Sequence, residues 1–228
     1  MGLLEAIVVV YLRELYFPGG FRFPLRFIPP RMLRTEMLRE LSTLAILTAV
    51  SAVATKKYIV RFAVFLFAFG VWDIFYYVFL KALLGWPQSF FTWDVLFLIP
   101  VTWVGPVLAP VVCSLTMIGL GLFFIVHDRE YAGARMERIA WLLMTAGAAL
   151  IVLSFVWDYA GILMEGGFSE GFAGLTADRT FQAAVASFVP TQYQWGLFGA
   201  GETLILLSAL TSYRKTAGNS ARPPDPPS

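Results

Sequence analysis

The chain has 228 residues, of which 58% are hydrophobic and 14% are charged, with a formal net charge of +2. An ordinary soluble domain carries about 25% charged residues, so this composition favours a membrane protein, and the small net charge gives no indication of a nucleic-acid partner. With one histidine and one cysteine in the chain, a bis-histidine haem, a zinc triad, a Ser-His-Asp relay and an intrachain disulfide are excluded. We therefore assign no metal site and no catalytic residue, and the sequence leaves the cofactor open.

Residues 1–37 are expected to form a segment at the membrane interface. Residues 3–16 are apolar but contain three charges, and fourteen residues of helix reach only about 21 Å, less than the roughly 30 Å hydrocarbon core. They are predicted to form an interfacial helix, or part of a span tilted against its neighbours. Residues 17–34 hold four prolines and four arginines among aromatic residues, which excludes one regular helix and favours the headgroup level.

An all-α, polytopic transmembrane helix bundle of about five spans is predicted over residues 38–216. The spans correspond to apolar runs at residues 38–55, 58–84, 106–126, 139–163 and 188–212. Residues 93–105 are broken by proline and are expected to be a re-entrant or interfacial segment, covered by protein. Residues 166–187 are expected to be a loop, partly helical over 180–186. The tail, residues 217–228, is expected to be a disordered proline-rich segment.

Lysines and arginines indicate the orientation of such a bundle, because they are in excess in cytoplasmic loops. Nine of them lie beside the spans on the side of the C-terminus, and two, Lys81 and Arg179, lie on the opposite side. This predicts a multi-pass protein of the cell inner membrane with a cytoplasmic C-terminus. The arginines of residues 1–37 contradict the count, since they then fall outside, and the side of the N-terminus stays open.

Three Trp-Asp pairs and one glutamate carry the candidate chemistry. Asp73, Asp158 and Glu202 fall inside predicted spans, and Asp94 begins the re-entrant segment. A carboxylate at the bilayer centre costs about 2.5–3.5 kcal/mol on the insertion scale. Such acids are therefore expected to face the bundle interior, to pair with a cation such as Arg61 or Lys81, or to take up a proton.

Helical spacing adds polar and aromatic neighbours to these acids. Tyr76 and Tyr77 follow Asp73 by three and four residues, so their hydroxyls are expected to donate to its carboxylate. A second stripe, expected to face the bundle, with Gly199 allowing close approach, comprises Gln192, Trp195, Gly199 and Glu202. The predicted ligand site is an aromatic and acidic pocket in the outer half of the membrane. Its residues are Asp73, Tyr76, Tyr77, Asp94, Trp103, Asp158, Gln192, Trp195 and Glu202.

Purely structural roles are compatible with the same residues. Asp73 and Asp158 would fix helix register through a hydrogen bond to a neighbouring helix, and Asp94 would be an N-cap. The tryptophans near the predicted interfaces would form an aromatic belt; they are Trp86, Trp93, Trp103 and Trp195.

The stretches FGVWDIFYYVFLKALLGWP and TWDVLFLIPVTWVGPVLAP, within residues 62–110, resemble segments of uncharacterised bacterial multi-pass membrane proteins. The resemblance covers under a quarter of the chain and implies no activity.

Three functions follow from these observations. The first is a membrane subunit or small-molecule or lipid-binding protein, whose partners are membrane lipid and other membrane subunits or further copies of the chain. The second is proton- or cation-coupled transport through Asp73, Asp158 and Glu202. The third is a membrane enzyme with Asp94 and Asp158 as acid and base on a lipid-linked substrate. Because no nucleophile–base pair is evident and no acid lies deep in the cytoplasmic half, the first is favoured over the second and third.

Overall fold

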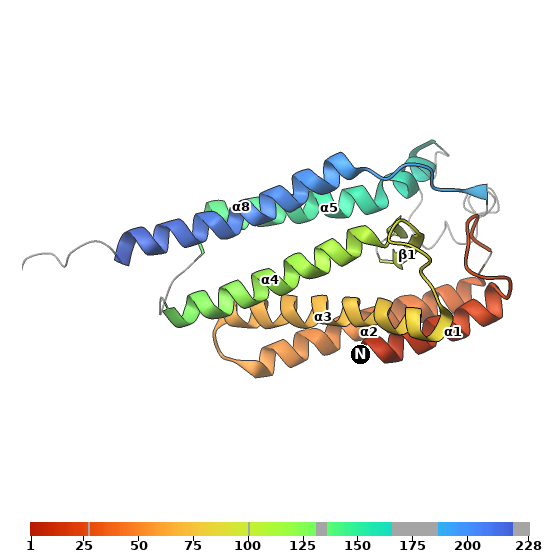
Figure 1. Ribbon diagram of the computed structural model, residues 1–228, viewed down its shortest axis with the longest axis horizontal. Coiled ribbons are helices and arrows are strands. Elements are labelled where there is room, and N and C mark those ends of the chain that lie inside the picture. Colours follow the sequence, from red (N-terminus) through yellow and green to blue (C-terminus); the bar gives the residue numbers. More distant parts are fainter. Residues whose placement is uncertain (27, 100, 131–135, 166–186, 221–228) are drawn as a thin grey trace, which may run out of the picture.

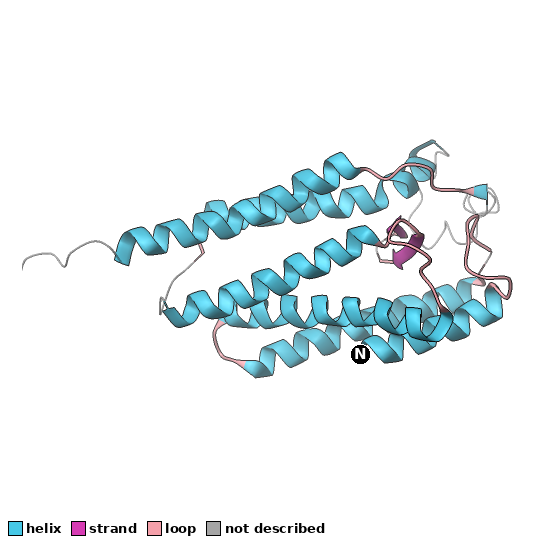
Figure 2. Cartoon of the chain, in the orientation of Figure 1, coloured by secondary structure: helices cyan, strands magenta, loops and turns pink. Residues whose placement is uncertain are grey.

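The computed structural model describes residues 1–26, 28–99, 101–130, 136–165 and 187–220. Within these residues there are six helices and one antiparallel pair of strands (Figures 1 and 2). The helices are α1 (Gly2–Tyr16), α2 (Pro30–Ala54), α3 (Tyr58–Leu84), α4 (Leu108–Glu130), α5 (Arg138–Glu165) and α8 (Trp195–Ser220), and the strands are β1 (Trp93–Phe97) and β2 (Trp103–Pro106). The expected helical bundle is confirmed, and the segment expected to be re-entrant or interfacial forms the two strands.

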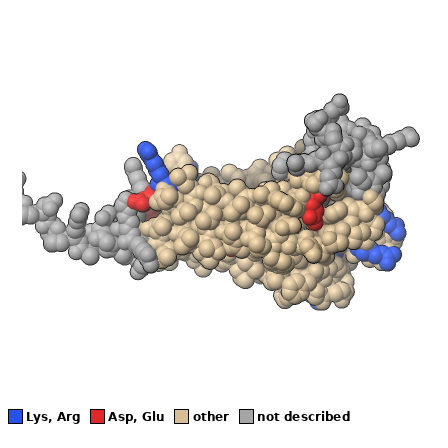
Figure 3. All heavy atoms as spheres, turned by 90° about the horizontal axis from the view of Figure 1, so that it is seen from above, with Lys and Arg blue, Asp and Glu red and all other residues tan. Residues whose placement is uncertain are grey.

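The described residues contain four helices that are long and apolar enough to cross a membrane. These are α2, α3, α4 as far as Arg129, and α5 as far as Ile162. Figure 3 shows one face of the bundle. Charged side chains lie near its two ends, and a broad belt without charge lies between them. One acidic patch lies inward from the charged side chains of one end. This composition supports the prediction of a membrane protein with transmembrane helices.

The long helices run side by side, and each of α3, α4 and α5 reverses the direction of the one before it, as α8 does that of α5 (Figure 1). We call the end that holds β1 and β2 the hairpin end, and the other the opposite end. Residues 17–26 also lie at the hairpin end (Figure 1). Lys57 and Asp128 close the opposite end, with the Lys57 Nζ 2.7 Å from a carboxylate oxygen of Asp128.

Two helix pairs are packed tightly through glycines. A Cβ added at Gly70 on α3 would lie 2.5 Å from the backbone oxygen of Ser114 on α4. Gly147 on α5 and Gly201 on α8 face each other, and a Cβ at either would lie within 2.7 Å of the other's backbone oxygen. Small residues at such crossings let helix backbones approach closely in membranes. The bundle therefore consists of an α3–α4 pair and an α5–α8 pair.

Helix α2 begins eight residues before the predicted span, because its first turns carry charges that apolar patterning does not recognise. Pro30 starts it, in the position where proline's missing N–H has no intrahelical acceptor. Its buried acids have partners: Arg39 donates to Glu36 at 2.8 Å, and Glu40 accepts from the Leu98 backbone N–H at 3.0 Å. With these partners the buried acids of the first turns are accommodated, and the helix continues into the apolar run.

Helix α1 does not lie across the end of the bundle, as an interfacial helix would, but runs along α3. Its start is close to the middle of α3, where a Cβ on Gly2 would lie 2.8 Å from the backbone oxygen of Trp72. Towards its C-terminal end, Arg13 reaches Trp86, just beyond the end of α3. The alternative, that these residues form part of a span tilted against its neighbours, therefore agrees with the structure better.

Helix α8 starts at Trp195, seven residues after the start of the predicted span, and ends at Ser220. Residues 217–220, expected to belong to a disordered tail, are helical. Residues 180–186 and 221–228, for which a partial helix and the rest of the tail are expected, lie outside the described residues.

Candidate functional site

The candidate site is a cavity of about 350 Å³ between the α3–α4 pair and the α5–α8 pair. All four of these helices line it, together with both strands and Glu5 of α1. Its wall is formed chiefly by aromatic and aliphatic side chains, and its charged groups are three carboxylates, those of Glu5, Asp73 and Glu202.

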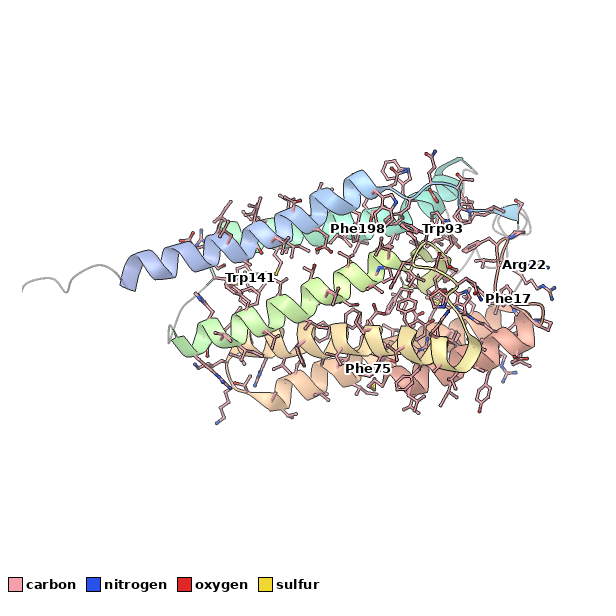
Figure 4. The ribbon with its side chains drawn as sticks, in the orientation of Figure 1. Phe17, Arg22, Phe75, Trp93, Trp141 and Phe198 are labelled. Carbon is pink, nitrogen blue, oxygen red and sulfur yellow. The ribbon has the colours of Figure 1, made fainter. Side chains whose placement is uncertain are left out.

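Aromatic contacts between the two sides border the cavity towards each end. Trp103 of β2 stacks on Phe155 of α5, with ring centroids 5.8 Å apart and planes at 15°. Towards the opposite end, Phe62 of α3 lies 5.5 Å from Trp141 of α5, a position labelled in Figure 4, where Phe17 and Arg22 mark the hairpin end. Ala148, midway along α5, lines the cavity and is also exposed at the surface. We take Ala148 as the candidate opening of the cavity, beside α5.

Two of the cavity acids lie on either side of α4 and are bound by its hydroxyl groups. Ser114 donates to Asp73 at 2.6 Å, and Thr116 donates to Glu202 at 2.8 Å. Glu202 is only 8% exposed, and its second oxygen, Oε1, is buried without a hydrogen-bond partner in the described part of the chain. The thiol of Cys113, a weak donor, also lies beside Glu202, so the site holds a buried carboxylate that has no strong donor at Oε1.

The third acid, Glu5, forms an ion pair with a residue outside the cavity wall. Arg39 of α2 donates to its carboxylate at 2.9 Å, while the side chain of Glu5 still contributes to the cavity wall. Burial outweighs this ion pair and raises the pKa of Glu5.

A buried ion pair joins α1 to the hairpin beside the cavity. Arg13 Nη2 lies 3.2 Å from Asp94 Oδ1, and the Tyr77 hydroxyl donates to the other oxygen of Asp94 at 3.3 Å. The guanidinium also lies 3.8 Å from the ring centre of Trp86 and 4.5 Å from that of Phe21. Burial raises the pKa of Asp94 to about 6, although Arg13 acts in the other direction. Both oxygens of the Asp94 carboxylate are thus bound, and they connect the hairpin to α1 and α3.

Of the nine residues predicted to bind a ligand, five line the cavity. They are Asp73, Tyr76, Tyr77, Trp103 and Glu202. The structure brings the other four to different places. Asp94 is buried in β1 behind Tyr77, and Asp158 is half-buried on α5 outside the cavity wall. Gln192, which precedes α8, and Trp195, which starts it, are both exposed.

Several predicted contacts are replaced by others. Tyr77 donates to Asp94 and not to Asp73, which is bound by Ser114 instead. The expected stripe on α8 does not form one inward face, since Gly199 has open space around it and Gly201 makes the close approach. Arg61 and Lys81, considered as partners for acids, donate to backbone oxygens of Thr55, and of Gly85 and Pro87.

Two alternatives for single residues are also corrected. Asp94 is not a helix N-cap, because it lies within β1 opposite Gly105. Trp86 does not belong to an exposed aromatic belt, because it is 8% exposed and covers Arg13.

Sequence reasoning missed Glu5, Ser114 and Thr116. The run from Val107 to Val126 is otherwise apolar, yet its two hydroxyl residues at 114 and 116 bind two of the cavity acids. Their positions, polar and two residues apart in an apolar span, are the signal that indicates them, because such groups in a membrane helix seek partners on neighbouring helices.

The comparisons with known proteins add no relative to this description. No family model, no curated protein and no solved structure matched the chain.

The two acids suggested as a catalytic pair are not brought together at the cavity. Asp94, suggested as one of a catalytic pair, is occupied by Arg13 and Tyr77, and Asp158 lies outside the cavity wall. Within the described residues, no three His, Cys, Asp or Glu side chains come close enough together to hold a metal ion. The arrangement suits a molecule that fills an apolar space and offers a donor to the buried acids.

Proposed function

We propose that this chain is a multi-pass membrane protein that binds an elongated apolar small molecule, such as a lipid, in the cavity between its two helix pairs. The observation that carries the proposal is the cavity itself, about 350 Å³ in volume and walled chiefly by aromatic and aliphatic side chains. Ligand sites of proteins are commonly apolar cavities of about 300–1,000 Å³ with a few placed polar groups.

The opening beside Ala148 supports entry of the ligand from the membrane. Ala146, Ala148 and Ala149 are all exposed on a helix that is apolar enough to span a membrane. Lipid chains would therefore border this opening, and an apolar molecule could enter sideways without crossing water.

The proposed arrangement has five spans, α2, α3, α4, α5 and α8, in the inner membrane. The excess of lysine and arginine beside the opposite end favours a cytoplasmic location for that end and for the C-terminus. The cavity acids then lie in the outer half of the membrane. The exposed apolar faces of the helices would be covered by lipid, by other membrane subunits or by further copies of the chain.

Transport of protons or cations is the second candidate, favoured by the position of Asp73 and Glu202 on either side of α4. It predicts ion flux in proteoliposomes that Asp73→Asn abolishes. Binding without flux would leave the first function standing alone.

Native mass spectrometry tests the binding function on protein extracted in nanodiscs of its own membrane. The wild type is expected to carry one defined apolar adduct. Ala148→Phe places a ring in the opening and is expected to remove the adduct, whereas Ala146→Phe, two residues away and outside the cavity wall, is expected to retain it. A bare wild-type chain, or equal adducts in both variants, would contradict the proposal.

A further inference from the structure

The charges of the cavity wall are one-sided. Among the described residues that line it there is no lysine, arginine or histidine, while Glu5, Asp73 and Glu202 contribute carboxylates. Glu5 is paired with Arg39, but neither Asp73 nor Glu202 takes part in any of the ion pairs found between described residues. The unbalanced charge of the cavity is therefore that of Asp73 and Glu202.

Hydrogen bonding at the cavity leaves groups of both kinds without a partner among the described residues, namely the carboxylate oxygen Oε1 of Glu202 and the indole N–H groups of Trp72 and Trp103. Asp73 and Glu202 each accept one bond from a hydroxyl of α4. Glu202 is more than nine-tenths buried, and its Oε1 is left unpartnered in the described structure. A buried acceptor without a donor is unfavourable, and more so when it is charged. A ligand that brings a donor or a positive charge to this oxygen removes that cost.

Aromatic faces near the acids favour the same kind of ligand. Trp72 precedes Asp73 on α3 and Tyr76 follows it. Both residues line the cavity, and so does Trp103. The faces of such rings attract cations, most strongly where water is excluded. The carboxylates therefore carry the preference for an organic cation, the aromatic wall adds to it, and the two indole N–H groups suit an acceptor elsewhere on the same ligand.

A bare metal ion fits the cavity less well than an organic cation. Hard cations take six or more oxygen ligands at close range, whereas the acids in the described residues form no group able to hold a metal. The wall also extends along α3 from Phe62 to Tyr77, a rise of about 22 Å. Much of this length is apolar, with Leu120, Met144 and Ile151 among the residues that form it.

We propose that the ligand is an amphipathic cation, with an ammonium group placed between Asp73 and Glu202 and an apolar chain lying along the cavity towards the opposite end. This inference rests on the proposed binding function and names the chemical class of its ligand.

The test compares three probes of equal chain length on purified full-length protein in nanodiscs of zwitterionic lipid. The probes are dodecylammonium, dodecanol and dodecanoate, and the readout is the dissociation constant. The ammonium is expected to bind at least about tenfold more tightly than the alcohol, and the carboxylate most weakly, since a bond to a buried charged group carries about that difference.

Variants assign the effect to the acids. Glu202→Gln and Asp73→Asn are expected to weaken ammonium binding about tenfold and to leave alcohol binding unchanged. Glu14→Gln, on an exposed position of α1, is the control and is expected to change neither. Using two variants keeps the test open if one of them does not fold.

The outcomes separate this inference from the function beneath it. Equal binding of all three probes to the wild type, with loss of all three in Ala148→Phe, would overturn the cationic ligand and leave the binding function in place. No binding of any probe, together with a bare chain in native mass spectrometry, would overturn both.

Discussion

Replacing Arg13 by methionine tests the role of the buried ion pair between α1 and the hairpin. Arg13 is 8% exposed and Asp94 is 1% exposed, so the substitution leaves a buried carboxylate with the Tyr77 hydroxyl as its remaining side-chain partner. Removing one member of a buried pair costs about 3–5 kcal/mol. We therefore expect Arg13→Met to reduce the free energy of unfolding by that amount at pH 8.

The matched control is the pair at the opposite end of the bundle. The Lys57 side chain is 57% exposed in its contact with Asp128, and exposed pairs contribute about 0.2–1 kcal/mol. Lys57→Met is therefore expected to change stability by no more than this. The assay is denaturant titration in mixed micelles, followed by circular dichroism at 222 nm, for the wild type and both variants.

A third variant identifies the cause of the loss. Adding Asp94→Asn to Arg13→Met removes the orphan carboxylate, and we expect it to recover more than half of the lost stability. If Arg13→Met costs no more than Lys57→Met, or if the added Asp94→Asn brings no recovery, the ion pair does not hold α1 and the hairpin together.

Two further predictions concern helix packing and pH. Gly201→Ala places a Cβ 2.7 Å from the backbone oxygen of Gly147 and is expected to cost about 1–3 kcal/mol of unfolding free energy by overpacking. Gly199→Ala, with open space around it, is expected to be neutral or to stabilise the helix by up to about 1 kcal/mol; equal effects of the two would refute the tight α5–α8 crossing. Burial raises the pKa of Asp94 from 3.8 to about 6, so the folded state holds this proton more tightly than the unfolded chain. The stability of the wild type relative to Asp94→Asn is then fully present below about pH 4 and is lost as the pH rises through about 6. A flat difference between pH 4 and 7 in paired melting curves would contradict this.

The helices could largely be predicted because their signal is local. Long apolar runs define α3, α4 and α5, and the glycine at position 85, with φ of 65°, ends α3 where the sequence suggests a turn. The start of α2 could not be predicted by hydropathy, because its early turns are charged. Their charges are paired only in the folded structure, where Arg39 forms ion pairs with Glu5 and Glu36.

The strands and the cavity depend on contacts that are distant in sequence. The run Trp93–Phe97 is short and apolar, and such runs do not distinguish a strand from a buried irregular segment by periodicity. Asp94 reaches Arg13 across 81 positions, and Thr116 reaches Glu202 across 86. Which acids face the cavity is decided by the glycine crossings that bring each helix pair together, and no spacing along one helix reveals which glycine makes the crossing.

Photo-crosslinking tests the central claim most directly, because it reports where a membrane ligand lies. A dodecyl ammonium probe with a diazirine on its chain would be activated in native nanodiscs, and modified residues identified by peptide mass spectrometry. The cavity account predicts labelling of Leu120 and Met144, which are 6% and 7% exposed and line the cavity. Labelling confined to Leu122 and Leu142, which lie two residues from them and are 49% and 63% exposed, would show that the probe only borders the outside of the bundle and would contradict the account.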